Sequence, residues 1–259
     1  MPKTFDICRV CGSKSNYLWN GNLLYNVNVG YFECNHCGYV QTEHPYWLQQ
    51  AYSNAINDSD TGIMFRNEGN VKTVIVTLLL LGLLPGKVID YAGGYGILVR
   101  LLRDMGIDAF WFDKYCQNIL SKGFEYKGGH GDLVTAFEVF EHFVDPVEEL
   151  DKLLDVAPNV LISTSFIPFP TPRFDEWWYY GKEHGQHIGF FRMKTLEYIA
   201  KKKGKYVISY GNTSHLITEI PINKYYWHFL LLFKAYIPFL LKFRLKPKTI
   251  DDHLFHSLK

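Results

Sequence analysis

The chain has 259 residues, enough for one large α/β domain with a small appendage, and its 47% apolar content supports a sizeable core. Its formal net charge of +1 excludes a strong positive field over the whole molecule, so we expect no nucleic-acid partner. The N-terminal sequence is polar and lacks the apolar core of a signal peptide, which predicts a cytoplasmic protein.

Four of the five cysteines lie in two Cys-x-x-Cys pairs near the N-terminus, Cys8 with Cys11 and Cys34 with Cys37. In a reducing compartment such pairs bind metal more often than they form disulfides. Each pair offers two thiolates on one side of a turn, and zinc takes four such ligands in a tetrahedron. The pattern predicts a zinc ribbon in which the metal is structural, because four thiolates leave no open coordination position.

A connecting segment follows, with a polar helical stretch and then a loop at 57–62. The apolar run at 71–84 ends at Pro85-Gly86, which predicts a buried helix too short to span a bilayer. The predicted organisation is a zinc ribbon, a connector, an α/β domain and a C-terminal tail, at residues 1–45, 46–70, 71–222 and 223–259.

After this helix, short apolar runs alternate with amphipathic stretches. The pattern predicts strands at 87–91, 109–112, 133–138 and 159–165, helices at 97–105, 147–156 and 195–203, and a closing strand pair at 206–210 and 215–218. Strands that alternate with helices indicate a mostly parallel sheet covered by helices on both faces.

A glycine-rich turn, residues 90–96 with the sequence Asp-Tyr-Ala-Gly-Gly-Tyr-Gly, follows the first of these strands. A nicotinamide dinucleotide site would need the spacing G-x-G-x-x-G, but Val99 stands at its third glycine. The carboxylate of Asp90 at the entry to the turn would repel a pyrophosphate and attract an ammonium group. We therefore predict that the turn binds S-adenosylmethionine, with glycines that let the methionine part lie against the backbone.

A second carboxylate, Asp113, ends the next predicted strand, 23 residues after Asp90. A spacing of about 20 residues is typical of the acid that binds ribose hydroxyls in nucleotide-binding α/β folds. An ordinary strand-to-helix turn is the alternative interpretation of the glycines, and the two flanking carboxylates disfavour it.

Three later segments carry further motifs: Phe137-Glu138-Val139-Phe140-Glu141-His142, Trp177-Trp178-Tyr179-Tyr180 and Gly185-Gln186-His187-Ile188-Gly189-Phe190. With the zinc ribbon and the turn at 90–96, they make nearly the whole chain resemble the class I S-adenosylmethionine-dependent methyltransferases. Within that family the chain is similar to a bacterial branch associated with sugar and surface-polysaccharide methylation. The resemblance implies a Rossmann-like, mostly parallel seven-stranded sheet with helices on both faces. Ala92 stands where the family's turn usually has its first glycine.

The resemblance also implies roles for the residues of the cofactor site. It assigns the methionine part of the cofactor to Asp90, Gly94 and Gly96, and the ribose to Asp113. It places Glu138, after the fourth strand, beside the sulfonium and the substrate. The predicted cofactor site further includes Tyr91, Ala92, Gly93 and Lys114.

The predicted catalytic residues lie in the segment 179–187. Methyl transfer is an in-line attack on a sulfonium methyl group, and a base helps a sugar hydroxyl to attack by taking its proton. Related sugar C-methyltransferases carry Glu-His where this chain has Gln186-His187, so the resemblance implies His187 as the base and favours O-methylation. Glu183 and His184 are further candidates for substrate binding. A structural role at a loop is the alternative for both histidines.

Several aromatic and charged residues leave two interpretations open. The segment 177–180 forms either a stacking wall for a sugar or nucleotide, or the core of a lid. Glu141 and His142 belong to the site, or else they cap a helix or lie in solvent. The tail at 225–248 is apolar but interrupted by Lys234 and Pro238, so it is a candidate interfacial helix on an anionic membrane. Packing on the catalytic domain or on a second subunit of a homodimer is the alternative.

The sequence thus predicts a methyltransferase that uses S-adenosylmethionine and carries structural zinc. We expect a small-molecule or glycan substrate, and most specifically the O-methylation of a nucleotide- or lipid-linked sugar in surface glycan biosynthesis. The alternatives are methylation of another small molecule, a protein or RNA, and a non-catalytic binding module. The near-neutral charge disfavours RNA.

Overall fold

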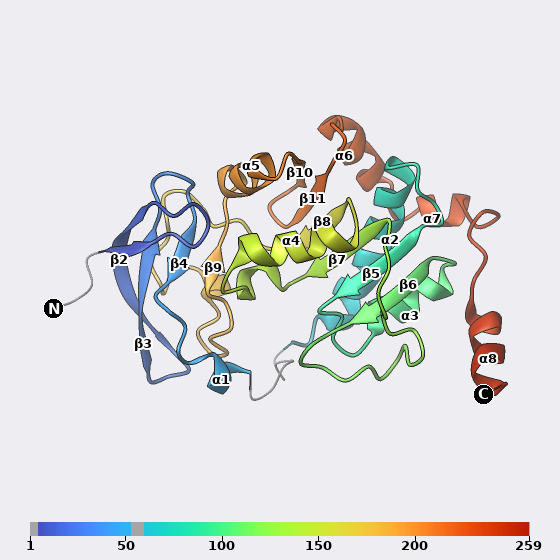
Figure 1. The fold of residues 1–259 in the computed structure, drawn as a ribbon, viewed down its shortest axis with the longest axis horizontal. Helices are drawn as coiled ribbons and strands as arrows, with labels where there is room; N and C mark the ends of the chain where they lie inside the picture. Colours follow the sequence, from blue (N-terminus) through green and yellow to red (C-terminus); the bar gives the residue numbers. More distant parts are fainter. Residues whose placement is uncertain (1–4, 53–59, 259) are drawn as a thin grey trace. The chain divides into compact units, whose positions relative to one another are not determined.

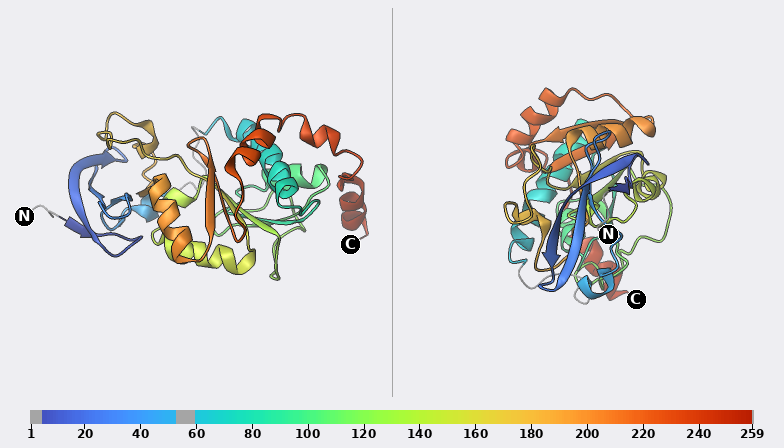
Figure 2. Two further views of the ribbon diagram at one scale, coloured as in Figure 1. Left: turned by 90° about the horizontal axis from the view of Figure 1, so that it is seen from above. Right: turned by 90° about the vertical axis from the view of Figure 1, so that its left-hand side faces the viewer.

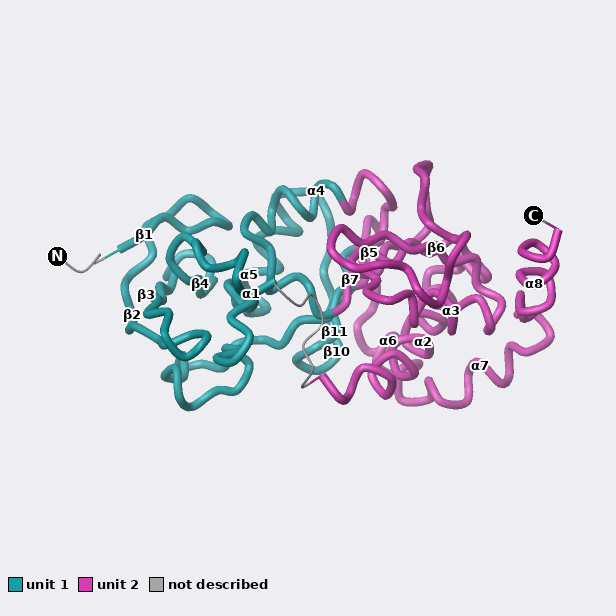
Figure 3. Tube along the Cα trace, turned by 90° about the horizontal axis from the view of Figure 1, so that it is seen from below, with its two compact units in different colours: residues 1–57, 138–152, 162–217 teal, residues 58–137, 153–161, 218–259 magenta. Residues whose placement is uncertain are grey.

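The computed structural model describes residues 5–52 and 60–258, so residues 57–59 of the predicted loop lie outside the described residues. The chain divides into two compact units, coloured separately in Figure 3. Unit 1 comprises residues 1–57, 138–152 and 162–217, and unit 2 comprises 58–137, 153–161 and 218–259. Each unit therefore draws on segments that are distant in the sequence.

Unit 1 contains a five-stranded antiparallel sheet with the order β1-β2-β3-β4-β9. Its strands are β1 (Phe5–Ile7), β2 (Lys14–Leu23), β3 (Val27–Glu33), β4 (Val40–Thr42) and β9 (Gly189–Phe190). The hairpin of β2 and β3 is long and curved (Figure 2). β9 comes from a distant part of the chain and pairs with β4, Val40 opposite Phe190. The sheet is therefore completed by residues well beyond the predicted zinc ribbon.

The core of unit 1 settles the interpretation of the segment 177–180. Tyr179 and Tyr180 are fully buried among the side chains of β2, β3 and β9, and the ring centroid of Tyr180 lies 5.4 Å from that of Tyr31. Trp177 packs against the same cluster, whereas Trp178 is 77% exposed. Both tyrosines are therefore core residues, but of the antiparallel sheet rather than of a lid, because buried aromatic rings supply much of the apolar area that a small sheet can bury.

The second sheet has six strands in the described residues, with the order β10-β11-β8-β7-β5-β6 (Figure 1). They are β5 (Lys87–Tyr91), β6 (Asp108–Phe112), β7 (Leu133–Phe137), β8 (Val160–Ser163), β10 (Tyr206–Tyr210) and β11 (Ser214–Thr218). β5 lies parallel between β6 and β7, so the carboxyl ends of these three strands meet at one edge of the sheet. The predicted α/β architecture is confirmed, and each strand lies within a few residues of its predicted position.

Helices accompany these strands as predicted. They are α1 (Leu48–Ala51), α2 (Ile63–Leu80), α3 (Ile97–Asp104), α4 (Pro146–Val156) and α5 (Met193–Lys202), with single 3₁₀ turns at Phe140–His142 and Trp178–Tyr180. α2 begins eight residues before the predicted apolar run at 71–84. Only its second half is buried, so the apolar signal marked the buried part of the helix and missed its half-exposed first turns.

The tail forms three further helices, α6 (Lys224–Leu232), α7 (Ile237–Leu240) and α8 (Thr249–Ser257). Within unit 2, Asp252 of α8 is buried and accepts hydrogen bonds from Arg103 at 2.6 Å and from Arg100 at 2.8 Å. These charge-assisted bonds fix α8 against α3, because a buried carboxylate without such partners would be strongly destabilising. Among the helices in the described part of the chain, none has both the length and the apolarity needed to cross a bilayer.

Candidate functional site

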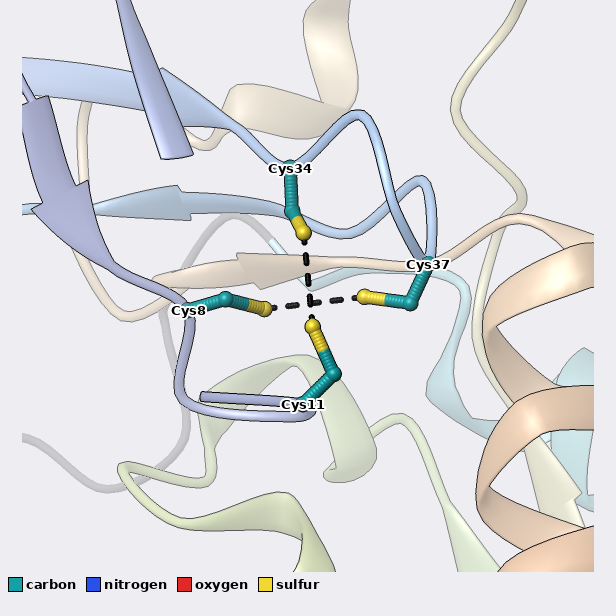
Figure 4. Close-up of side chains that lie close together, drawn as sticks. All are labelled: Cys8, Cys11, Cys34 and Cys37. Atoms are coloured by element: carbon teal, nitrogen blue, oxygen red, sulfur yellow. Dashed lines mark hydrogen bonds between the residues drawn. The ribbon is translucent and has the colours of Figure 1, made fainter. Parts of the chain in front are cut away.

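The four paired cysteines meet at the ends of two hairpins in unit 1 (Figure 4). The first pair lies between β1 and β2 and the second between β3 and β4, and their sulfur atoms all lie within 4.8 Å of one another. The Sγ atoms of Cys8 and Cys37 are 3.5 Å apart, and those of Cys11 and Cys34 are 3.4 Å apart. Disulfide sulfur atoms would be about 2.05 Å apart. The disulfide alternative is therefore excluded.

The donor set fits a zinc ion. Zinc–thiolate bonds of about 2.3 Å in a tetrahedron place sulfur atoms roughly 3.8 Å apart, close to the separations found here. Gly12 and Gly38 follow the second cysteine of each pair with φ of +73° and +76°, a backbone conformation that favours glycine and lets the chain turn tightly there. The four cysteines that the sequence singled out thus form a preformed cluster that is consistent with zinc.

Asp90 lies in β5 of unit 2 with only 3% of its surface exposed. The hydroxyl of Thr135 in the neighbouring strand β7 donates a hydrogen bond to Asp90 Oδ1 at 2.7 Å. The pKa of the Asp90 carboxyl is raised to about 7, chiefly by burial, with the Thr135 hydrogen bond lowering it and the charge of Asp113 adding to the rise. A bound cation would offset the free-energy cost of burying the charged carboxylate, so Asp90 favours a positively charged ligand.

The backbone of the turn is held in the left-handed region at Ala92, Gly94 and Gly96, with φ of +58°, +54° and +85°. A Cβ on Gly96 would lie 2.3 Å from Ser121 Oγ, and a Cβ on Gly93 would lie 2.8 Å from Asp90 Oδ2. The sequence interpretation explained the glycines by close approach of the ligand. The structure adds a requirement of the protein itself, because side chains at 93 and 96 would overlap neighbouring groups.

Asp113 lies just beyond β6 and accepts three backbone hydrogen bonds. Gly94 N donates to Oδ2 at 2.9 Å, and Tyr115 N and Cys116 N donate to Oδ1 at 2.7 and 2.8 Å. The carboxylate therefore ties the glycine turn to the loop after β6. A carboxylate offers about four acceptor sites, so one stays available for a ribose hydroxyl.

Two other predicted cofactor residues lie beside this turn. The ring centroid of Tyr91 lies 5.1 Å from that of Phe112 in a tilted arrangement. The Lys114 side chain is exposed, with Nζ 5.3 Å from the Tyr115 ring centroid. The buried acid, the left-handed turn and the second acid suit the ammonium, the methionine backbone and the ribose of S-adenosylmethionine. When bound, that cofactor supplies an electrophilic methyl group on a sulfonium.

Glu138, in unit 1, also has an unusual backbone, with φ of +54°. Its N–H donates to Ser163 Oγ at 2.8 Å, and the Ser163 hydroxyl donates to Glu138 Oε1 at 2.5 Å. Its side chain is exposed directly after β7. Holding a non-glycine residue in this left-handed region costs of order 1–3 kcal/mol of conformational free energy, and such residues cluster at functional sites. The backbone of Glu138 therefore agrees with its predicted role in the site.

A second group of titratable side chains lies in unit 1, and we call Glu141, His142, His184 and His187 the histidine cluster. The ring centroid of His187 lies 4.9 Å from that of His142 and 4.7 Å from that of His184. Ile188 N donates to the carbonyl of Glu141 at 2.9 Å, which holds the two distant segments side by side. The segments at 140–142 and 184–188 therefore form one site.

The tautomer of His187 follows from its partner. His187 Nδ1 lies 2.6 Å from the carbonyl oxygen of Tyr179, and because a carbonyl only accepts, Nδ1 carries the proton. The lone pair is then on Nε2, which lies 3.8 Å from Glu141 Oε1. Burial lowers the pKa of His187 to about 4, so the ring is neutral at neutral pH.

The other two histidines have separate partners. Burial lowers the pKa of His142 well below its usual range, and the neighbouring rings lower it further. Burial also lowers the pKa of His184 to about 4, and its Nδ1 accepts a hydrogen bond from Gln186 N at 3.1 Å. His142 Nδ1 lies 2.8 Å from the hydroxyl of Tyr52. Glu183, the other predicted catalytic residue, is exposed.

For Glu141, two of the three interpretations that the sequence left open are wrong. It neither caps a helix through its side chain nor lies in solvent, because its side chain is fully buried and accepts a hydrogen bond from the Tyr179 hydroxyl at 2.5 Å. Burial raises the pKa of this carboxyl to about 7. The available signal was the placement of Glu141 and His142 between Phe140 and Phe143, since flanking aromatic residues indicate a segment turned toward a core.

Comparison with known proteins identifies the family. A family profile described as a methyltransferase domain matches residues 66–210, more than half of the chain. A search of curated protein sequences gives no match.

Solved methyltransferase structures are similar to part of this chain at low sequence identity. One is magnesium protoporphyrin IX methyltransferase from Synechocystis PCC 6803 with bound S-adenosylhomocysteine, at 16% identity and a TM-score of 0.42 over 66% of this chain and 90% of that one. Another is an O-methyltransferase family protein from Burkholderia thailandensis, at 18% identity and a TM-score of 0.46 over 66% and 61%. A third is the bifunctional kinase-methyltransferase WbdD, at 16% identity and a TM-score of 0.39 over 70% and 43%.

The matched residues include the complete glycine turn after β5, both flanking carboxylates and the histidine cluster. The chain belongs to the methyltransferase domain family and is an S-adenosylmethionine-dependent methyltransferase.

Proposed function

We propose that the protein transfers the methyl group of S-adenosylmethionine to a hydroxyl oxygen of a sugar, nucleotide- or lipid-linked, in surface glycan biosynthesis. The observation that carries the proposal is the neutral His187, whose Nε2 lone pair lies beside the buried carboxyl of Glu141. A neutral imidazole can take the proton of a hydroxyl, and a nearby carboxylate stabilises the imidazolium that results.

The proposed reaction is an in-line displacement. The O–H bond of the acceptor breaks as its proton moves to His187 Nε2, the new O–CH₃ bond forms, and the S–CH₃ bond breaks with its electron pair returning to sulfur. Asp90 and the backbone at 92–96 are proposed to hold the methionine part of the cofactor, Asp113 the ribose, and Glu138 the region of the sulfonium. Positioning of the two reactants supplies most of the acceleration in such a step.

Gln186 supports oxygen rather than carbon as the acceptor atom. Its side-chain Nε2 donates a hydrogen bond to the Ala51 carbonyl at 2.9 Å, and the residue is buried. A carboxylate at this position could not donate that bond. The position before the proposed base is therefore occupied by a structural amide rather than by a second acid.

The substrate class is tested in cells. We expect one methylated sugar to disappear from the surface glycans when the gene is deleted, as measured by mass spectrometry, and to return when the wild-type gene is restored. Glycans unchanged by the deletion would refute a sugar acceptor while leaving the methyltransferase assignment intact.

We expect His187→Ala to lower turnover by roughly 10²-fold or more, because the hydroxyl proton would lose its acceptor. The variant should bind S-adenosylmethionine with wild-type affinity in isothermal titration calorimetry. Full restoration of the methylated sugar by the His187→Ala gene would eliminate His187 as the base.

The pKa of Asp90 predicts how cofactor affinity depends on pH. Because its folded-state pKa is raised to about 7, Asp90 is protonated below that pH and must lose a proton to attract the ammonium. Affinity should therefore fall about tenfold per pH unit below pH 7, as linkage to one proton requires. Asp90→Asn should bind weakly at every pH and remove this slope. Calorimetry across the pH range makes the measurement, and a wild-type affinity that stays constant would contradict the role of Asp90.

We also propose that the tail contacts an anionic membrane surface. Many apolar side chains of 225–243 are exposed, including Leu240 at 72% and Phe243 at 84%, and basic residues follow at Arg244, Lys246 and Lys248. Exposed apolar groups flanked by lysine and arginine are typical of segments that lie at the surface of anionic bilayers.

Vesicle flotation tests this contact. The protein should float with vesicles that contain phosphatidylserine and less with phosphatidylcholine alone. Phe243→Ser should weaken binding about 10- to 150-fold, because burying one phenylalanine contributes about 1.5–3 kcal/mol. Phe65→Ser, at an equally exposed side chain outside the tail, should change nothing. Absence of flotation, with a concentration-dependent mass in light scattering, would instead assign the tail to a homodimer.

A further inference from the structure

Three members of the histidine cluster present metal-ligating atoms to one point. Glu141, His142 and His187 each offer one such atom, and these atoms all lie within 4.8 Å of one another. His187 Nε2 and Glu141 Oε1 are 3.8 Å apart. Bonds of about 2.0–2.2 Å from nitrogen and oxygen to a divalent ion span separations of this size.

The free ring nitrogens point to the same conclusion. His187 donates its Nδ1 proton to the Tyr179 carbonyl, which leaves Nε2 for a ligand. The Tyr52 hydroxyl lies 2.8 Å from His142 Nδ1, and in the tautomer in which Nδ1 donates its proton to that hydroxyl, the lone pair of His142 Nε2 is available for a ligand. Metal-binding histidines nearly always donate their other ring proton to a neighbouring oxygen, because this fixes the ring and makes the ligand more basic.

The carboxylate provides an independent observation. Glu141 is fully buried, and the Tyr179 hydroxyl occupies Oε1. Oε2 is buried too and has no partner within hydrogen-bond distance among the described residues, although the Thr164 hydroxyl lies close enough to lower the pKa of the carboxyl. A buried carboxylate oxygen without a partner is costly, so such an atom needs an explanation such as a bound ion.

We propose that Glu141, His142 and His187 form a second metal site that binds a divalent cation, separate from the four-cysteine site. Two imidazoles and one carboxylate suit first-row cations such as Mn²⁺, Fe²⁺, Co²⁺ or Zn²⁺, whereas four thiolates select Zn²⁺. Three protein ligands leave coordination positions open, unlike the closed four-cysteine site. Hydroxyl oxygens of an acceptor are suitable ligands for those open positions.

The metal site itself does not depend on the proposed function. Only the role of the cation in methyl transfer rests on it. A cation on His187 Nε2 takes the lone pair that accepts the proton in the cation-free protein. In the cation-loaded protein a coordinated hydroxyl has a lowered pKa, and its proton leaves to solvent water before the oxygen attacks the methyl group. The cluster then acts by coordination instead of by proton acceptance at His187.

Manganese binding tests the site without any assay of activity. Full-length protein carrying one equivalent of zinc, which the four thiolates retain, is titrated with Mn²⁺ while the signal of free Mn²⁺ is followed by electron paramagnetic resonance. We expect the wild type to bind one Mn²⁺. Glu141→Gln and His187→Gln should lower the affinity at least about 100-fold, because each removes one ligand of three.

Two further variants make the test specific. Tyr52→Phe should weaken binding by about 10–100-fold by releasing His142, as expected for the loss of a group that orients a ligand. His184→Ala is the matched control, since its ring lies against His187 but it is outside the trio of ligands, and it should bind Mn²⁺ like the wild type. Thermal unfolding without Mn²⁺ checks that each variant is folded.

The outcomes separate this inference from the proposed function. A wild type that binds no Mn²⁺, or binding unchanged in both Glu141→Gln and His187→Gln, overturns the metal site. Cofactor affinity, measured by calorimetry in the same samples, depends on the glycine turn and does not change with that result. Loss of the methylated sugar in the deletion strain tests the proposed function alone.

Discussion

Replacing Cys34 by serine is expected to unfold the antiparallel sheet of unit 1. The four thiolates join the β1–β2 and β3–β4 turns, and β1 and β4 have only three residues each, too few to hold the hairpins together by backbone pairing. Structural zinc sites contribute apparent binding free energies of about 10–16 kcal/mol in small zinc-finger peptides, and that binding is coupled to folding. The loss should therefore be far larger than that of a typical core substitution.

The second cysteine turn also anchors the start of α5. The Thr195 hydroxyl donates to the Cys37 carbonyl at 2.9 Å, and Lys194 Nζ donates to the Asn35 carbonyl at 3.1 Å. Unfolding of the turn would release these bonds as well. Far-UV circular dichroism should show a melting transition at much lower temperature, and metal analysis should show less than one zinc per chain.

Cys116→Ser is the matched control, because it removes the fifth thiol, which lies outside the four-cysteine site. It should retain its zinc and its melting temperature. Chelation of the wild type should reproduce the Cys34→Ser result. A Cys34→Ser protein that melts like the wild type would show that the metal contributes nothing to the stability of the sheet.

Gly96→Val is expected to abolish cofactor binding and to destabilise unit 2. The residue has φ of +85°, and its new Cβ would lie 2.3 Å from Ser121 Oγ and 2.7 Å from Asn118 Oδ1. The left-handed backbone costs of order 1–3 kcal/mol for a non-glycine residue, and steric overlap in a packed site adds about 1–3 kcal/mol. The turn must shift to relieve the overlap, and the backbone proposed to hold the methionine part shifts with it.

Gly82→Val separates the two contributions. Gly82 also has a left-handed backbone, with φ of +70°, but a Cβ there would meet nothing within 4 Å. This control variant should lose only the part of the free energy of unfolding that the left-handed backbone costs. It should bind S-adenosylmethionine with normal affinity. Urea unfolding gives the free energy of unfolding, and calorimetry gives the affinity for S-adenosylmethionine. Wild-type affinity in Gly96→Val would contradict the assignment of the turn to the cofactor.

Local chemistry explains why so much of the fold was predictable. A short apolar run bounded by turn residues, a turn that needs a positive φ and a pair of cysteines separated by two residues each leave a signal within a few neighbouring residues. The strands that carry the cofactor turn were therefore placed within a residue or two of β5 and β6. The roles predicted for Asp90, Asp113 and His187 remain predictions, because they concern a ligand rather than the fold.

The glycines show where a correct prediction had an incomplete reason. The sequence identified the turn at 90–96 from its composition, and explained it by the approach of a ligand. The contacts of Gly93 with Asp90 and of Gly96 with Ser121 lie within the protein. No pattern in the sequence pairs residue 96 with residue 121, because that contact exists only once the loop after β6 has folded back on the turn.

The sequence by itself determined the α/β class, the four-cysteine site and the position of the glycine turn, since each depends on residues close together in the chain. Only the tertiary structure decided that β9 completes the sheet of unit 1, that Tyr179 and Tyr180 lie in its core, and that Glu141 is buried beside His187. These outcomes depend on contacts between residues far apart in the sequence, where burial and hydrogen bonding, rather than local propensity, set which side chains meet.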